Sequence, residues 1–407
     1  MQYFRNYELA KLYHVSQATV GKWVEAAKQG KLGLTLSTKE GKTYVANTVN
    51  NTSIIEQLVA DRRKYRNHKA AKTIEPQARF YELYTQQQIL DIMVNLEVQH
   101  EMPFQYSYFE DGADYWDKYA QRLYEETTPN VLKNIINLLE KNQSYIDDIL
   151  ARYKRVNIVD IGVGNALPVK QLLSHFLETG RLGRYIAIDI SEKMLDIAES
   201  NVKKWFDGRV AFERYRLDIN YDRFTDVLAD EYVQEDSKDI ANLVLVLGGT
   251  FGSFRTPEGA FKIIHDSMGL NDLFIYSKKL DTDTSRRYFD FNLQPGKTAL
   301  AQNDRFIFDL FNIDESFYDV EMGFDEELSQ RFIRARLKVA LRIKFYFDNG
   351  ARFIDLNKGD AILLWRGWQQ SAIDVVHQLN QNAFYPLHTS QTDDQELILA
   401  ISRIKHQ

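Results

Sequence analysis

Four predicted strands in the middle of the chain end in small or acidic residues, which are residue types that can hold a nucleoside. They cover residues 155–161, 185–188, 210–217 and 241–247. Glycine lets a backbone turn sharply and approach a ligand, and an acidic side chain at a strand end can accept both hydroxyls of a ribose. The candidate ligand-binding residues at the four ends are Asp160, Gly162, Gly164, Asp189, Asp218, Gly248 and Gly249.

The glycine spacing argues against a dinucleotide or a nucleoside triphosphate. Ala166 and Leu167 follow where the last glycine of G-x-G-x-x-G should come, and no G-x-x-x-x-G-K-[ST] occurs. A nucleoside without phosphates fits better, and we predict S-adenosylmethionine. Its ribose would lie on Asp189, its adenine near Asp218, and its methionine end over the glycines at 162–164.

These residues need a parallel sheet to bring them together. Short, continuously apolar runs are typical of strands that are buried on both faces, and helical patterns follow the first two runs. We therefore predict an α/β fold, with two final strands within residues 384–404. In this fold Asp160 would orient the glycine loop, and Asp218 has the alternative role of a helix cap.

The amino-acid composition excludes several kinds of functional site and bounds the number of domains. The chain has 407 residues, enough for two or three domains, and 44% of them are hydrophobic. The absence of Cys excludes disulfides, thiolate metal sites and cysteine nucleophiles, and the eight His show no metal-ligand spacing. Without a signal peptide or a run of about 18 apolar residues, we expect a soluble, cytoplasmic protein.

The first 75 residues form a basic head on an acidic body. They hold 13 Lys and Arg against 6 Asp and Glu, a net charge of +7, whereas the whole chain has −6. A short helix at 7–13, a turn, a second helix from Gln17 to about Gln29 capped by Ser16, and a hairpin turning near Glu40-Gly41 predict a winged helix-turn-helix.

This segment, YELAKLYHVSQATVGKWVEAAKQGKL, resembles the excisionase and MerR-like DNA-binding modules. The resemblance implies that the second helix lies in the major groove of duplex DNA. Its outward residues would be Gln17, Thr19 and Lys22, and Lys42 on the wing would contact phosphate. A protein-docking module is the alternative.

A helix continues after the wing. Its apolar stripe of Ile54, Ile55, Leu58 and Val59 either pairs two subunits in a homodimer or packs against the chain's own body. The basic run from Arg62 to Lys72 is either a solvated face or a contact to phosphates.

The body resembles the histidine-specific methyltransferases of ergothioneine biosynthesis. The motifs VDIGVGNALPVKQLL, YIAIDISEKML and LVLGGTFGSF occur in that order, preceded by PFQYSYFEDGADYWDKY and followed by SRRYFDFN and FIDLNKGDAILLW. The resemblance covers about residues 75–407. It implies a Rossmann-like, seven-stranded methyltransferase sheet with S-adenosylmethionine as cofactor and a second α+β substrate lobe.

The implied domains follow from these matches. Residues 1–52 would be the winged helix-turn-helix and 53–74 a basic connecting helix. The substrate lobe would comprise 75–130 and 281–368, and the methyltransferase core would comprise 131–280 and 369–407.

The resemblance also assigns acceptor-binding positions. Tyr108 and Tyr288 match substrate-contacting tyrosines, and Tyr288 would position the amine that is methylated. Ser253 stands where an Asn would hold the substrate carboxylate. Trp365 and Gly367 replace the Glu and Ser that select the imidazole, so free histidine is not the expected acceptor.

Three functions differ in class. The first is a small-molecule N-methyltransferase with a DNA-binding head. The second is a nucleic-acid methyltransferase delivered by the head, against which the absence of Cys and the GGTFGS ending of the fourth run both argue. The third is a transcriptional regulator whose body senses S-adenosylmethionine or another metabolite without turnover.

Overall fold

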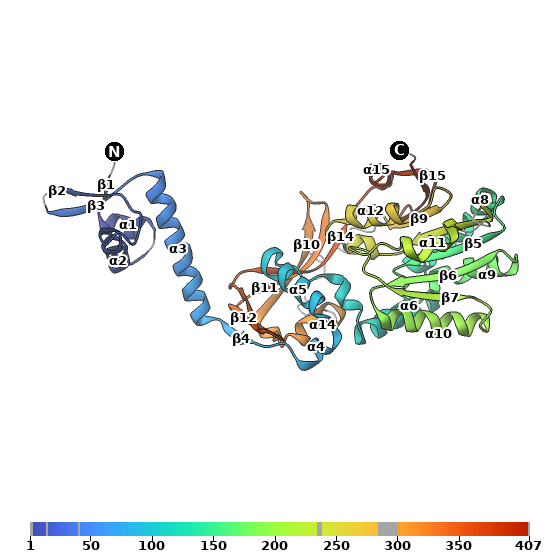
Figure 1. Cartoon of the computed structure of the whole chain (residues 1–407), viewed down its shortest axis with the longest axis horizontal. Coiled ribbons are helices and arrows are strands. Elements are labelled where there is room, and N and C mark those ends of the chain that lie inside the picture. The colour runs from blue at the N-terminus through green and yellow to red at the C-terminus, as the bar shows by residue number, and fades with distance from the viewer. Residues whose placement is uncertain are drawn as a thin grey trace.

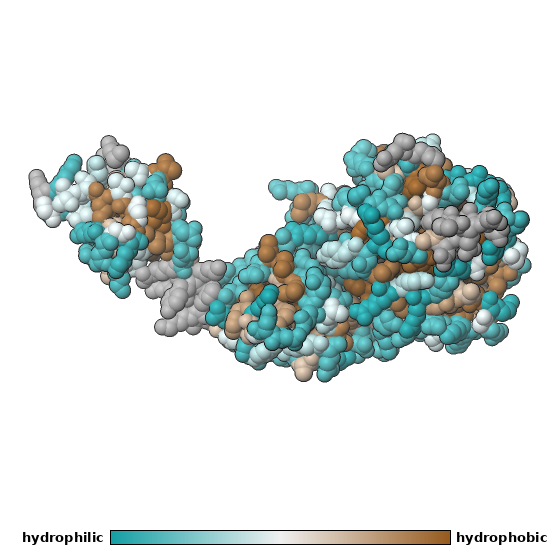
Figure 2. Space-filling view, in the orientation of Figure 1, coloured by the Kyte–Doolittle hydropathy of each residue, from teal (hydrophilic) through white to brown (hydrophobic). Residues whose placement is uncertain are grey.

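The computed structural model describes residues 3–13, 15–39, 41–233, 238–283, 300 and 302–405. An N-terminal head, a second lobe and a sheet-centred core follow one another along the view in Figure 1. Hydrophilic residues cover much of the face seen in Figure 2, with apolar residues interspersed. No helix in the described part of the chain is both long and apolar enough to cross a bilayer.

The core is built on a seven-stranded sheet whose order is β15-β16-β9-β8-β5-β6-β7. All of its strands run parallel except β16, which is antiparallel to both of its neighbours. The predicted α/β fold with a seven-stranded methyltransferase sheet is confirmed. The strands are β5 Arg155–Ile161, β6 Leu182–Asp189, β7 Phe212–Arg216, β8 Ile240–Val246, β9 Leu273–Lys279, β15 Phe384–Gln391 and β16 Leu397–Ile404.

Helices cover both faces of this sheet, which explains why the central strands are apolar throughout. One face packs against α7, α8, α9 and α10, and the other packs against α11, α12 and α15. Side chains that alternate along β5 enter the two layers in turn, Ile158 one and Val159 the other. The helices are α7 Val131–Lys141, α8 Gln143–Leu150, α9 Lys170–Glu178, α10 Glu192–Phe206, α11 Thr225–Val233, α12 Pro257–Ser267 and α15 Ala372–Gln381.

The second lobe has a hydrophobic core of its own, formed by residues from 80–109 and 300–364. Two three-stranded sheets surround it, with orders β10-β11-β14 and β13-β12-β4. Its elements are β4 Lys72–Ile74, α4 Ala78–Leu83, α5 Gln86–Val94, α14 Gln302–Leu310, β10 Tyr318–Asp325, β11 Gln330–Leu337, β12 Leu341–Phe347, β13 Gly350–Leu356 and β14 Ala361–Trp368. Helix α6, Asp111–Glu125, packs on the core through Tyr119 and Leu123.

The head comprises β1 Tyr3–Phe4, α1 Asn6–Leu12, α2 Gln17–Lys28, β2 Leu36–Lys39, β3 Lys42–Ala46 and the start of α3 Val49–Ala70. Ser16 caps α2 as predicted, because its Oγ accepts the Thr19 N–H at 3.2 Å. The buried Asn51 side chain holds α3 to the hairpin by donating to the carbonyl of Ala46 at 2.7 Å and accepting the N–H of Thr35 at 2.9 Å. From there α3 leads toward the second lobe (Figure 1).

One prediction for the head is wrong, and one of its two open alternatives is decided. Thr19 was expected on the outer face of α2 but is only 3% exposed, because its Oγ1 lies 2.8 Å from the Ser16 Oγ at the helix start. The stripe on α3 was considered for pairing two subunits, but Ile55 and Val59 are buried in the head's own core, with Ile54 packed beside them. Thr19 therefore cannot reach a base edge, and the stripe is not free to form a dimer.

Candidate active site

The glycine loop after β5 has the conformation that its sequence requires. Gly162 and Gly164 have φ angles of +71° and +53°, which side chains other than glycine rarely adopt. The Gly162 N–H donates to the Ile188 carbonyl at 2.8 Å, which fixes the loop against the end of β6. A Cβ on Gly164 would meet no atom within 4 Å, so the loop faces open space where a ligand can approach.

Asp189 lies at the carboxyl end of β6, directly beside this loop. Its carboxylate accepts the Ser191 N–H at 3.0 Å and makes a long, 3.5 Å contact with the Gly164 N–H. Burial raises the pKa of Asp189 to about 6, against the lowering effect of these N–H donors. A half-buried carboxylate with capacity for further donors is what the two hydroxyls of a ribose need.

Asp160 has a structural role below the glycine loop. It is 3% exposed and accepts a hydrogen bond of 2.9 Å from the Tyr185 hydroxyl, inside the layer below the loop. Burial, opposed by this hydrogen bond, raises the pKa of Asp160 to about 7. Asp160 therefore holds the end of β5 to a side chain of β6, and its predicted contact with the cofactor stays a prediction.

Asp218 forms a turn and caps no helix. Its Oδ1 accepts the Asn220 N–H at 3.0 Å and the Asn220 amide at 2.8 Å, and α11 begins only at Thr225. Burial raises its pKa, and the nearby carboxylates of Asp222 and Asp91 add to this effect. Because Asp91 belongs to α5, the second lobe reaches the place where adenine is expected.

The loop after β8 is held to the neighbouring strand. The Gly248 N–H donates to the Ser277 hydroxyl of β9 at 2.9 Å, and Gly248 has a φ angle of +80°. A Cβ on Gly249 would meet nothing within 4 Å, and a 3₁₀ helix follows over Thr250–Ser253. The predicted strand-end residues therefore lie on adjacent strands at one edge of the sheet.

Tyr108 comes from the second lobe and lies at the same edge. Burial, and then the charge of Asp189, raise the pKa of Tyr108, so its phenol lies within electrostatic range of Asp189 and stays protonated. Its ring is 5.3 Å from that of Trp116 and 5.5 Å from that of Phe104, measured between centroids. The structure thus brings the predicted acceptor-binding Tyr108 to the predicted cofactor-binding Asp189.

A close backbone approach positions Tyr108. A Cβ on Gly112, at the start of α6, would lie 1.8 Å from the Ser107 carbonyl oxygen. Only glycine permits α6 to begin directly against the 3₁₀ helix Phe104–Tyr108. This close approach explains why residue 112, four positions after Tyr108, is a glycine.

Helix α6 also joins the second lobe to the glycine loop. The Asn165 amide donates to Asp117 at 2.9 Å, and Lys193 at the start of α10 lies 3.7 Å from Asp114. Asn165 directly follows Gly164 and is 4% exposed. Helix α6 therefore contacts both the second lobe, through Trp116 and Phe104, and the cofactor loop, through Asp117 and Asn165.

Trp365 and Gly367 depend on each other. A Cβ on Gly367 would lie 2.6 Å from the Trp365 ring, so the indole occupies the space that a side chain at 367 would need. Trp365 is half-buried and packs against the core of the second lobe, next to an extra residue in β14 where the pairing with β11 shifts. The Trp368 indole N–H donates to the Phe254 carbonyl at 2.7 Å, which places the end of β14 beside Thr250–Ser253.

Two predicted acceptor residues are described only in part or not at all. Tyr288 lies outside the described residues. Ser253 ends its 3₁₀ helix, and only its backbone is described.

Sequence reasoning missed three residues of this region: Trp116, Asn165 and Trp368. Trp116 and Trp368 are identified only by tertiary contacts, which no spacing rule encodes. Asn165 had a usable signal, because it directly follows the G-x-G.

A family comparison agrees with this geometry. The model of the family described as "Histidine-specific methyltransferase, SAM-dependent" matches residues 86–289. The chain belongs to this family. It is an S-adenosylmethionine-dependent methyltransferase, as predicted.

Comparisons with individual proteins add little to this assignment. The search of curated proteins gave no match. An S-adenosylmethionine-dependent methyltransferase from Clostridium acetobutylicum is 11% identical with a TM-score of 0.40, covering 72% of this chain and 99% of its own. The 1,6-didemethyltoxoflavin-N1-methyltransferase of Burkholderia thailandensis is 11% identical with a TM-score of 0.36, covering 80% and 92%.

The residues present fit the cofactor of this family. Asp189 offers a half-buried carboxylate to a ribose, Gly164 faces open space, and Asp218 keeps one oxygen, Oδ2, that the Asn220 bonds do not use. When bound, S-adenosylmethionine supplies an electrophilic methyl group. The protein's own contribution is to place an acceptor in line with that methyl and to keep water out.

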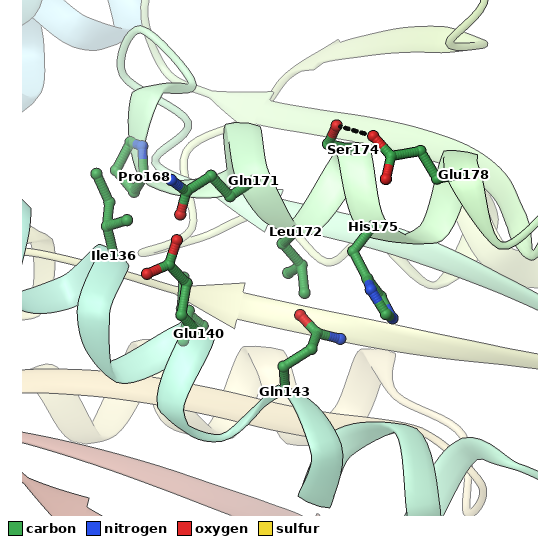
Figure 3. A pocket seen from close by; sticks show the side chains of 10 residues that line it. Ile136, Glu140, Gln143, Pro168, Gln171, Leu172, Ser174, His175 and Glu178 are labelled. Atoms are coloured by element: carbon green, nitrogen blue, oxygen red, sulfur yellow. Dashed lines mark hydrogen bonds between the residues drawn. The ribbon is translucent and has the colours of Figure 1, made fainter.

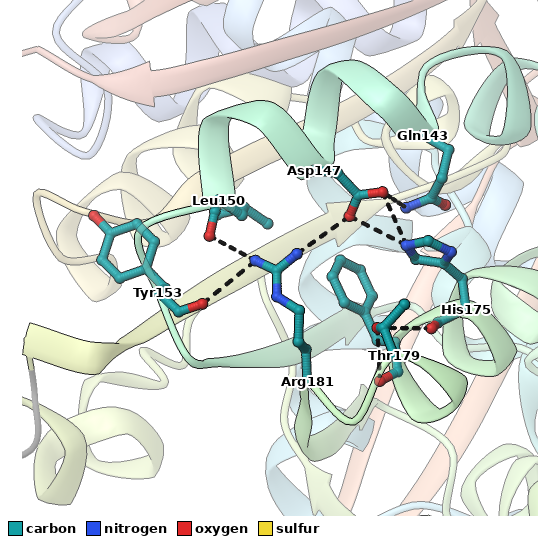
Figure 4. A network of polar contacts seen from close by, with 8 residues as sticks. Gln143, Asp147, Leu150, Tyr153, His175, Thr179 and Arg181 are labelled. Carbon is teal, nitrogen blue, oxygen red and sulfur yellow. Dashed lines mark hydrogen bonds and ion pairs between the residues drawn. The ribbon is translucent and has the colours of Figure 1, made fainter.

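A separate pocket of about 340 Å³ lies between α7, the start of α8 and α9 (Figure 3). None of its lining residues is a strand-end residue. Beside it, Asp147 accepts hydrogen bonds from His175 and Arg181, while Arg181 also donates to the carbonyl of Leu150 (Figure 4). This network fixes α8 and α9 on the sheet and takes no part in the site described above.

Proposed function

We propose that the methyltransferase N-methylates a small amine or an amino-acid-like acceptor other than free histidine. The observation that carries this proposal is the indole of Trp365 lying over Gly367. By resemblance, these positions are where a Glu and a Ser would bind the imidazole. An indole offers neither a carboxylate nor space for a Ser side chain, so the groups that would recognise imidazole are missing.

The aromatic cluster around Tyr108 supports an amine as the nucleophile. The Tyr108 hydroxyl, protonated and near Asp189, can orient a lone pair, and the faces of Tyr108 and Trp116 attract a cationic amine before it loses its proton to solvent. Tyr288 remains the candidate for the residue that positions the amine. An in-line approach to about 3 Å needs positioning more than acid–base help.

Methyl transfer to a panel of amines and amino acids, followed by mass spectrometry, tests this function. We expect transfer to at least one acceptor and none of useful rate to free histidine. Efficient trimethylation of histidine would contradict the proposal. Cofactor binding without transfer to any acceptor would instead favour a regulator that senses S-adenosylmethionine.

We further propose that the head binds duplex DNA through α2. Gln17 and Lys22 are exposed on α2, as is Lys42 at the start of β3, and the segment 1–75 has a net charge of +7. Polar residues early in a capped helix can approach base edges, while lysines on a wing can contact phosphate. Thr19 is not part of this surface.

A fluorescence anisotropy titration of the full-length protein with duplex DNA tests the head. Lys42→Ala should weaken binding to all sequences equally and reduce the salt slope by about one unit, whereas Gln17→Ala should change the preference at one position. Lys141→Ala, on the exposed side of α7 in the core, is the matched control and should have no effect. No DNA binding at low salt would leave the docking-module alternative.

A further inference from the structure

Lys278 is a buried ammonium group next to the loop that follows β8. It is 5% exposed and lies near the carboxyl end of β9. Its Nζ would be 3.4 Å from a Cβ placed on Gly252, so the amine lies against the 3₁₀ helix Thr250–Ser253.

Within the described part of the chain, Lys278 makes no hydrogen bond or ion pair. Burial alone lowers its pKa, to about 8, and no carboxylate acts on it. A lysine that served only to hold the loop would donate to the carbonyls of that loop. Burying an ammonium group without a partner is costly, so its retention here calls for a ligand.

The neighbouring residue, Lys279, has different electrostatic surroundings from those of Lys278. Lys279 points to the other side of β9. Burial lowers its pKa too, but the carboxylates of Glu396 and Asp394 oppose this effect, while Arg331 adds to it. Lys279 is therefore balanced by the protein's own charges. Lys278 has no such counter-charge.

The position of Lys278 is on the acceptor side of the sheet edge. In the strand order, β9 lies beyond β8, away from β5 and β6, which carry the glycine loop and Asp189. The hydrogen bond from Trp368 to Phe254 brings the end of β14 to the same loop. Lys278 therefore lies against the same loop that the end of β14 contacts, on the β9 side of the strands that carry the cofactor residues.

We propose that Lys278 binds the carboxylate of the acceptor and so makes this methyltransferase selective for amino acids over the corresponding amines. A charge-assisted hydrogen bond from its Nζ would satisfy both the buried ammonium and the substrate carboxylate. Lys278 would supply the carboxylate contact that the family's Asn makes, because this chain has Ser253 where the resemblance places that Asn. The inference rests on the proposed function and specifies its substrate class.

Calorimetry with matched ligand pairs tests the inference on the full-length protein saturated with S-adenosylhomocysteine. The pairs are tyrosine and tyramine, tryptophan and tryptamine, phenylalanine and phenethylamine, and ornithine and putrescine. Each pair differs in the carboxylate alone. Methyl transfer to the same compounds from S-adenosylmethionine is measured in parallel.

The wild-type protein should bind at least one amino acid more tightly than its amine, and Lys278→Met should weaken that binding roughly 10- to 100-fold. Lys278→Arg should retain part of the preference, and the matched control Lys279→Met should retain all of it. In turnover, Lys278→Met should raise KM far more than it lowers kcat.

Two outcomes would overturn the inference. One is a wild-type protein that binds no amino acid of the panel more tightly than its amine. The other is a Lys278→Met protein that binds S-adenosylhomocysteine normally and keeps the wild-type preference. Failure of the proposed function looks different, because preferential binding of amino acids would persist without any methyl transfer.

Discussion

The cofactor half and the acceptor half of the active site are built in different ways. The cofactor half consists of the ends of neighbouring parallel strands, with Asp189 and Gly164 held beside one another by the pairing of β5 with β6. The acceptor half that we propose combines Tyr108 and Trp116 with the core loop 250–254, Lys278 and residues 365–368, and the hydrogen bond from Trp368 to Phe254 joins the second lobe to that loop. Sheet topology therefore specifies the first half, and tertiary packing specifies the second.

The largest expected effect is on the cofactor half. Gly164→Val places a branched side chain in the open space beside Asp189 and should lower S-adenosylmethionine affinity by roughly 100-fold or more, about 3 kcal/mol. Gly180→Val is the matched control, because Gly180 also has a positive φ, +67°, and open space around it. Both variants carry the same backbone strain, but only Gly164→Val should lose binding in calorimetry. Equal affinities would contradict the placement of the cofactor.

The second prediction concerns the backbone contact that positions Tyr108. Gly112→Ala would force its Cβ against the Ser107 carbonyl and should lower the free energy of unfolding by about 2 kcal/mol. Gly259→Ala, in α12 with nothing within 4 Å of its Cβ, should instead stabilise the protein by up to about 1 kcal/mol through helix propensity. Urea unfolding measures both changes. A neutral Gly112→Ala would mean that α6 does not depend on this close approach.

The third prediction is the pH dependence of cofactor binding. The pKa of Asp189 is raised to about 6, so the carboxylate that accepts the ribose hydroxyls is ionised above this pH and protonated below it. Affinity should be constant above about pH 7 and fall roughly tenfold by pH 5. Asp189→Asn should bind weakly at every pH, without this slope. Asp160→Asn should keep the slope, since the hydrogen bond of the Asp160 carboxylate goes to Tyr185.

The smallest effect tests the acceptor half. Gly367→Ser alone should destabilise the protein, because its Cβ meets the Trp365 ring, and Trp365→Glu should relieve this clash. A double-mutant cycle by urea unfolding should give a coupling of about 1 kcal/mol. The double variant should also gain histidine binding. Additive single effects would show that the two positions are independent.

The two halves also differ in how far the sequence predicted them. Continuous apolar runs located β5, β6 and β8, and the residues after them identified the cofactor half. Trp116 had no signal, because it meets Tyr108 only through the turn at Glu110, which has a φ angle of +43°. In the sequence, Lys278 and Lys279 cannot be told apart, because both follow the same apolar run. Only tertiary packing determines which of the two lacks a counter-charge. Thr19 was misplaced because its hydroxyl turns inward to the capping Ser16.

The central claim is that Asp189 anchors S-adenosylmethionine where the two halves of the site meet. Calorimetric titration of the wild-type protein and of Asp189→Ala with S-adenosylmethionine tests it most directly, with Asp196→Ala on the exposed side of α10 as the control. We predict binding by the wild type and the control, and a loss of roughly 2–3 kcal/mol for Asp189→Ala, the scale for removing a charged hydrogen-bonding partner. No binding by the wild-type protein, or equal binding by Asp189→Ala, would contradict the claim.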